Sequence, residues 1–238
     1  MSKTVLLEEK TEERQRMPLR PVIAEPTEFT EEKVVGAISF QVILKGPSGI
    51  DTITTNTQRA RFSIGPTWSI VATVNTFDVV PIEGSFDERL EQFKKKKKRE
   101  SLTGHISHYF TEDRFPLEKK SKGPYTVHLV KFNKRAGSEE AISLLSGDKL
   151  WMRPSIFEEL LDFGLNYPTV QEHHRVTALG SSAKMLQKST GGGQVEVELV
   201  PALSCGKSRD IARRMLTVTP WRTIHPTGEM FLAVNKWP

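Results

Sequence analysis

Gly206-Lys207-Ser208 has the types and spacing that close a phosphate-binding loop, in which backbone amides and a lysine cradle phosphates. Such a loop also needs glycine five positions before Gly206, because only an unhindered backbone can turn its amides onto the phosphates. That position is Pro201, which lacks an amide and has a fixed φ. The segment therefore predicts a turn, with Ser208 as the N-cap of a helix over 208–216.

Histidine and cysteine are too scattered to predict a metal or redox site. His105 and His108 have a spacing that could start a metal site on a helix, but no acid completes a ligand set. His173 and His174 would point to opposite faces of a strand. Cys205 is the single cysteine, which excludes an internal disulfide and a zinc-binding cysteine cluster and is typical of a reducing compartment. We expect no metal, no cofactor and no catalytic residues, and hence a protein that is not an enzyme.

The basic run Lys94–Arg99 is the clearest functional feature, because six adjacent cations repel one another unless they are solvated or bind a polyanion. Residues 89–135 carry 14 Lys/Arg against 5 Asp/Glu, a net charge of +9, whereas the whole chain has a formal charge of +5. The predicted import or polyanion site is Lys94, Lys95, Lys96, Lys97, Lys98 and Arg99, with Lys119, Lys120, Lys122, Lys131, Lys134 and Arg135 as auxiliary cations.

Three functions fit this run, and a solvated loop is the alternative to all of them. It could be a nuclear-import signal that an import receptor binds. It could bind nucleic-acid phosphates by releasing counterions. It could bind an anionic membrane surface, where each lysine contributes about 1 kcal/mol. Phe110, Phe115 and Tyr125 lie among the cations, where they could stack on bases or enter headgroups, or else belong to the core.

The elements that would position these residues predict an α+β fold: a β-rich single domain with an antiparallel sheet and three or four short helices. Residues 1–33, rich in charge and proline, predict a flexible N-terminal arm, and 34–238 the domain, with a basic helix-loop insertion at 86–123. Neither a secretory signal nor a membrane-spanning run is expected.

Hydrophobic periodicity and turn residues give the order of these elements. Strands are expected at 34–45, 50–56, 59–64 and 67–75, forming an antiparallel meander, and later at 125–130, 170–179, 194–200 and 230–234. Helices are expected after the capping boxes at Ser85 and Ser155, and at 138–145 and 208–216. Residues 100–123 are expected to be a long polar connection.

A proline-containing arm, a compact β-rich domain, a lysine-rich patch and a closing strand-helix-strand unit (194–200, 208–216, 230–234) make the chain similar to rhabdovirus matrix proteins, especially those of plant viruses that replicate in the nucleus. The resemblance implies a structural virion protein that self-associates, condenses the nucleocapsid and contacts the membrane peripherally, located in the virion and the host nucleus. The alternatives are a nucleic-acid-binding viral movement or coat protein and, in a third class, a cellular enzyme.

Overall fold

The computed structural model describes residues 27–55, 59–95, 103–117, 123–147, 150–188, 192–208, 211–227 and 229–236. The strands are β1 (Thr27–Glu32), β2 (Ser39–Gly46), β3 (Gly49–Thr55), β4 (Arg59–Ile64), β5 (Ser69–Val79), β6 (Thr103–Ile106), β7 (Tyr125–Phe132), β8 (Ala136–Gly137), β9 (Met152–Pro154), β10 (Val176–Thr177), β11 (Ala183–Lys188), β12 (Gln194–Ser208), β13 (Ile211–Pro220), β14 (Ile224–His225) and β15 (Met230–Asn235). The helices are α1 (Phe86–Lys94), α2 (Ser138–Ser146), α3 (Phe157–Asn166) and α4 (Val170–His173). The predicted α+β class and β-rich single domain are confirmed.

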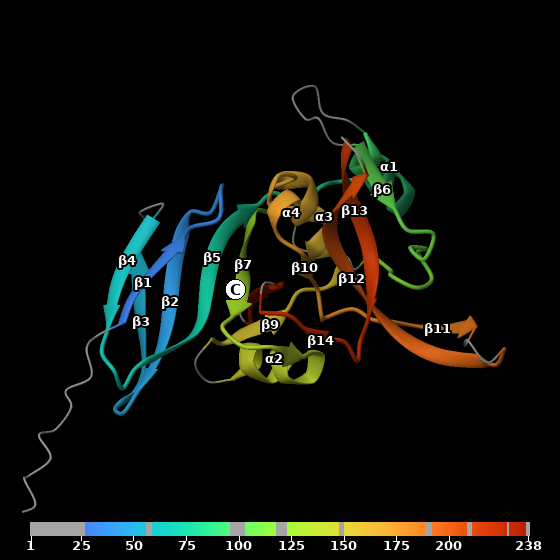
Figure 1. Cartoon of the computed structure of the whole chain (residues 1–238). Coiled ribbons are helices and arrows are strands. Elements are labelled where there is room, and N and C mark those ends of the chain that lie inside the picture. Colours follow the sequence, from blue (N-terminus) through green and yellow to red (C-terminus); the bar gives the residue numbers. More distant parts are fainter. Residues whose placement is uncertain are drawn as a thin grey trace, which may run out of the picture.

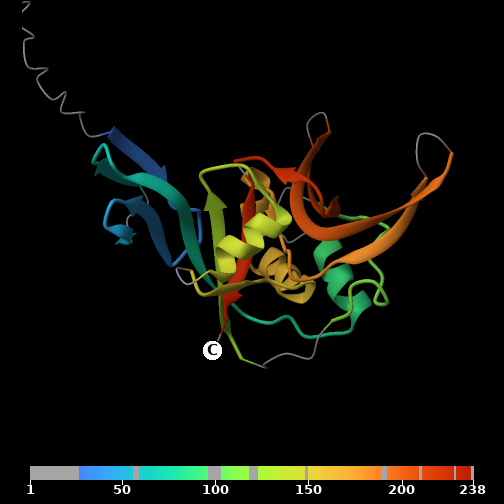
Figure 2. The ribbon, with the colours of Figure 1, turned by 90° about the horizontal axis from the view of Figure 1, so that it is seen from below.

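One large sheet organises the molecule, with the strand order β3-β2-β5-β7-β15-β10-β12-β13-β6 (Figure 1). Its neighbours are antiparallel except for β10 with β15 and β13 with β6, so the sheet is mixed and not purely antiparallel. The predicted meander is only partly right: β2 and β3 form a hairpin, but β4 leaves the sheet to pair with β1, and β5 pairs with β2. Figure 2 shows β11 and β12 running away from the body as a ribbon.

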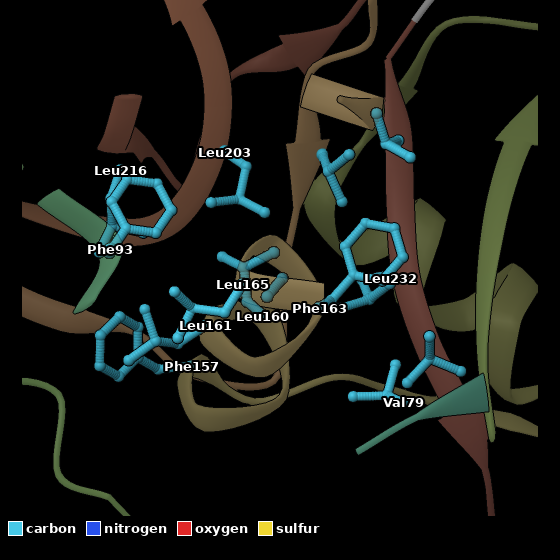
Figure 3. Close-up of a cluster of buried hydrophobic side chains, with 14 of the residues drawn as sticks. Val79, Phe93, Phe157, Leu160, Leu161, Phe163, Leu165, Leu203, Leu216 and Leu232 are labelled. Carbon is cyan, nitrogen blue, oxygen red and sulfur yellow. The ribbon is translucent and has the colours of Figure 1, made fainter. Parts of the chain in front are cut away.

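Apolar side chains on both faces of this sheet are buried, which explains why its central strands lack a wet face. On one face, Ala72 and Val74 of β5 join a core cluster with Ala141 and Leu145 of α2. On the other face, a second cluster brings together side chains from the sheet, α1 and α3, with Phe157, Leu160, Leu161, Phe163 and Leu165 contributed by α3 (Figure 3). Helix α3 is therefore buried on almost every side.

Strand β1 corrects the predicted arm, because residues 27–32 belong to the folded domain. They pair in antiparallel register with β4, and Phe29 packs against a cluster of Phe40, Val42, Leu44 and Ile64. Burial of this aromatic side chain supplies stabilisation that the charged sequence around it does not reveal. Residues 1–26 lie outside the described residues.

Three further predictions are wrong in ways that matter for the site. Ser208 ends β12 and residues 211–216 belong to β13, not to a helix, because β13 pairs with β12 in antiparallel register along its whole length. Residues 170–179 form α4 and the short β10 in place of one strand. The expected connection at 100–123 contains β6, and two of its phenylalanines enter the core.

Candidate functional site

Helix α1, which leads into the basic run, begins at the predicted capping box. The Ser85 Oγ accepts a hydrogen bond from the Glu88 amide at 3.4 Å, and a Glu88 carboxylate oxygen accepts one from the Ser85 amide at 2.8 Å. Hydrogen bonds from Ser85 hold the pKa of Glu88 below its ordinary value. Phe86, Leu90 and Phe93 are buried, as their spacing predicted, so one face of the helix is fixed to the core.

A buried ion cluster ties the middle of α1 to α3. Arg89 Nη1 donates to a Glu158 carboxylate oxygen at 2.8 Å, and Arg89 Nη2 donates to Asp162. Asp162 also accepts hydrogen bonds from the Tyr125 hydroxyl at 3.0 Å and the Ile82 amide at 3.1 Å. Burial raises the pKa of Asp162, although the Arg89 guanidinium opposes this shift. These contacts fix the rotation and position of α1 on the domain.

Arg214 of β13 holds the end of α1, where the basic run begins. Its side chain is fully buried, lies 5.2 Å from the centre of the Phe93 ring, and donates from Nη2 to the carbonyls of Phe93 at 3.1 Å and Lys95 at 3.3 Å. A cation here satisfies carbonyls that have no partner within the helix and complements the helix dipole. Gly104 of β6 also packs directly against the end of α1, because a Cβ at this position would lie 2.1 Å from the Phe93 carbonyl oxygen.

Lys94 and Lys95, the residues of the run that the structure describes, lie at the end of α1 that Arg214 holds. Helix α1 ends at Lys94, whose ammonium lies 2.5 Å from a Glu91 carboxylate oxygen, and Lys95 is already extended. Arg213 of β13 is exposed, and its backbone pairs in register with Thr103, the first residue of β6. Lys96, Lys97, Lys98, Arg99, Lys119, Lys120 and Lys122 lie outside the described residues.

The remaining auxiliary cations lie at the far end of β7. That strand starts at Tyr125, beside Asp162 of α3, and Lys131 is six residues further on, about 20 Å along an extended strand. Lys131 forms an ion pair with Glu31 at 3.2 Å, and Lys134 forms one with Glu140 at 2.5 Å. Arg135, next to Lys134, is exposed. The positive segment of the sequence is thus divided between two regions of the molecule.

The aromatic residues among the cations are part of the core and are not open to bases or headgroups. Phe110 and Phe115 are buried around Phe157, and the Phe110 and Phe157 rings stack with centroids 5.2 Å apart. Tyr125 is partly buried, and its hydroxyl is bonded to Asp162. Phe110, Phe115 and Tyr125 are therefore not available to stack on bases or to enter headgroups.

A second cluster resembles the serine-histidine-acid array of hydrolases. Ser138 Oγ lies 3.1 Å from Nε2 of His225, and Nδ1 of His225 lies 2.9 Å from a Glu229 carboxylate oxygen. However, the hydroxyl of Ser138 donates to the Trp221 carbonyl at 2.6 Å, so Nε2 of His225 donates to the serine oxygen. That is opposite to the role of a general base, and Ser138 is buried away from any substrate.

Sequence reasoning missed this cluster because its members are distant in the chain and carry no motif. Burial acts to raise the pKa of Glu229, but hydrogen bonds from His225 and Thr177 and the charge of Arg175 outweigh it and lower the pKa. The cluster joins α2, β14 and β10, and we interpret it as a hydrogen-bond network with a structural role.

No family model, curated protein or solved structure matches the chain. Within the described ranges, three or more His, Cys, Asp or Glu side chains nowhere gather as a metal site, and none of the helices has the length and apolar character to cross a membrane. Gly206-Lys207-Ser208 ends β12, so the segment is neither a phosphate loop nor a helix N-cap. Cys205 is half-buried in the same strand, and its thiol lies 3.9 Å from the Gly206 carbonyl oxygen.

Proposed function

We propose that this protein is a non-enzymatic structural protein of the viral matrix type, which bridges a nucleocapsid and an anionic membrane surface through the basic run Lys94–Arg99. One observation carries the proposal: the run starts where the buried side chains of Arg89 and Arg214 hold α1 in place. A rigid base presents charge with a smaller loss of conformational entropy on binding than a flexible one.

Binding to single-stranded RNA and to phosphatidylserine vesicles tests the proposal. If six cations each neutralise one RNA phosphate, affinity falls about 300-fold between 50 and 200 mM salt. A variant with Lys94–Arg99 all changed to Gln loses most of this affinity and salt dependence. The control changes six exposed cations outside the predicted site to Gln, namely Lys45, Arg59, Arg61, Lys184, Lys188 and Arg222. Equal loss in both variants would show that only net charge matters and would overturn the proposal.

A fluorescent fusion separates the matrix proposal from the viral movement or coat protein that is its alternative. Nuclear accumulation that disappears in the Lys94–Arg99 variant supports binding of an import receptor by this run. Accumulation at cell-wall junctions, with binding to single strands but not to vesicles, supports the movement protein instead.

The self-association expected of a matrix protein is proposed to use strand β3. It pairs only with β2 among the described strands, and its exposed side chains, Asp51, Thr52 and Thr54, include no lysine that would block pairing with another strand. Changing Thr52 and Thr54 to Lys is expected to lower the association constant in sedimentation equilibrium. An unchanged association constant would exclude this edge.

A further inference from the structure

A row of side chains that crosses three neighbouring strands of the large sheet lines a cavity. In register, Thr73 of β5 lies opposite Lys131 of β7, and Lys131 lies opposite Met230 of β15. Strand β1 covers the sheet on one side of this row and α4 on the other (Figure 1). Between them is a cavity of about 550 Å³, a volume within the range of small-molecule sites.

The floor of this cavity is polar at positions where the same sheet face is otherwise apolar. Thr73 and Asn75 line it, although only 4% and 1% of their surfaces are exposed. Asn75 Oδ1 accepts a hydrogen bond from the Val34 amide at 2.8 Å, which leaves its NH₂ group as a donor. Because both side chains line the cavity, the Asn75 NH₂ group and the Thr73 hydroxyl can donate hydrogen bonds to a ligand bound there.

The charged groups of the cavity also favour an acceptor ligand. Lys131 is the cation on the floor, and its ammonium is 3.2 Å from a carboxylate oxygen of Glu31, on the β1 wall. The His174 imidazole lies on the α4 wall, where burial, His173 and Lys131 lower its pKa and Glu31 raises it. The Glu31 carboxylate thus forms the ion pair with Lys131 that a ligand carboxylate would form.

We propose that this cavity binds a small organic carboxylate, whose oxygens accept from Lys131, Asn75 and Thr73 and displace Glu31 from the lysine. The chain of the ligand lies against Val34, Val170 and Met230, the apolar residues of the cavity walls. The carboxylate fits better than an inorganic anion, because it satisfies the polar floor and covers the apolar walls together. The site shares no residue with the basic run and does not depend on the proposed function.

Hexanoate is the probe, with hexanamide as its uncharged match and inorganic phosphate as the anion without an apolar chain. We expect two-dimensional ¹⁵N–¹H spectra of the full chain to shift at Thr73, Lys131 and His174 with hexanoate alone. Equal binding of hexanamide would show an apolar cavity without carboxylate recognition. Binding of phosphate without hexanoate would show an inorganic-anion site. Either result would overturn the proposal.

Two variants test opposite sides of the ion pair. Lys131→Met keeps the apolar stem of the side chain and is expected to weaken hexanoate binding at least tenfold, whereas Lys134→Met, outside this cavity, leaves it unchanged. Glu31→Gln removes the competing carboxylate and is expected to tighten binding several-fold. Thermal unfolding of each variant checks that the fold is intact. If Lys131→Met were unfolded, unchanged or weaker binding by Glu31→Gln would still refute the proposal.

Discussion

Replacing Arg89 by methionine removes the cation between α1 and α3 while keeping most of the volume of the side chain. Glu158 and Asp162 would then be buried carboxylates without their ion-pair partner. Removing one partner of a buried pair costs about 3–5 kcal/mol, because the remaining charge is uncompensated. We expect Arg89→Met to lower the free energy of unfolding by this amount in urea denaturation, a large fraction of the stability of a single domain.

The pH dependence of this deficit has a definite sign. In the native protein, burial already raises the pKa of Asp162 above its ordinary value, and loss of Arg89 raises it further. A carboxylic acid with a raised pKa in the folded state stabilises the fold when protonated, and this contribution is lost as the pH rises through the folded-state pKa. The deficit of Arg89→Met is therefore smallest near pH 4 and grows toward neutrality.

A triple variant, with Arg89→Met, Glu158→Gln and Asp162→Asn, separates charge from packing. Without buried carboxylates it is expected to recover much of the lost stability, as neutral replacements of buried ion clusters do. A deficit below about 1 kcal/mol for Arg89→Met would refute the reasoning, as would a triple variant less stable than Arg89→Met at pH 7.

Gly104→Ala is expected to cost about 3 kcal/mol or more in chemical denaturation, because the new Cβ would lie 2.1 Å from the Phe93 carbonyl oxygen, whereas Gly123→Ala, with no atom near its Cβ, should be close to neutral. Ser138→Ala is expected to lower the free energy of unfolding by about 1–2 kcal/mol without changing the rate of hydrolysis of 4-nitrophenyl acetate. A hydrolysis rate that depends on this serine would contradict the structural role of the network. Glu229→Gln removes a carboxyl group whose pKa is lowered in the folded state. Such a group stabilises the fold above its unfolded-state pKa, and this stabilisation is lost as the pH falls through the folded-state pKa. The melting temperature of the variant should therefore depend less on pH below about 4.5 than that of the native chain.

Local signals explain which elements could be predicted from the sequence. The start of α1 follows from Ser85 and Glu88, only three residues apart, and its buried face follows from Phe86, Leu90 and Phe93. The capping box predicted at Ser155 was half right: α3 follows it, but Glu159 accepts from the Ile156 amide, and Ser181 caps Phe157 from elsewhere in the chain. A local pattern found the helix, but a distant residue completes its cap.

Elements chosen by distant pairing could not be predicted. The sequence around Arg213 and Arg214 has residues that favour an exposed helix. However, this segment pairs with β12 through backbone hydrogen bonds, and this tertiary pairing overrides the local helix propensity. Arg214 consequently points into the core while its neighbour Arg213 is exposed. The candidate carboxylate site was beyond prediction for the same reason: Thr73 and Lys131 meet through the register of β5 and β7, and Glu31 reaches Lys131 from β1, which pairs with β4 in a separate sheet. Its one sequence signal is that Thr73 and Asn75 occupy alternate positions of β5, on the face that carries Phe77 and Val79 further along the strand.

The end of α1 and the start of β6 are both held in place, the first by Arg214 and the second by its pairing with β13. The seven residues between Lys95 and Thr103 therefore join two points whose separation the domain sets. The entropy of closing such a connection changes slowly with its length, by about 0.6 kcal/mol for each doubling. The length of this segment can consequently vary, by evolution or by design, with little change in the closure entropy that the domain must offset.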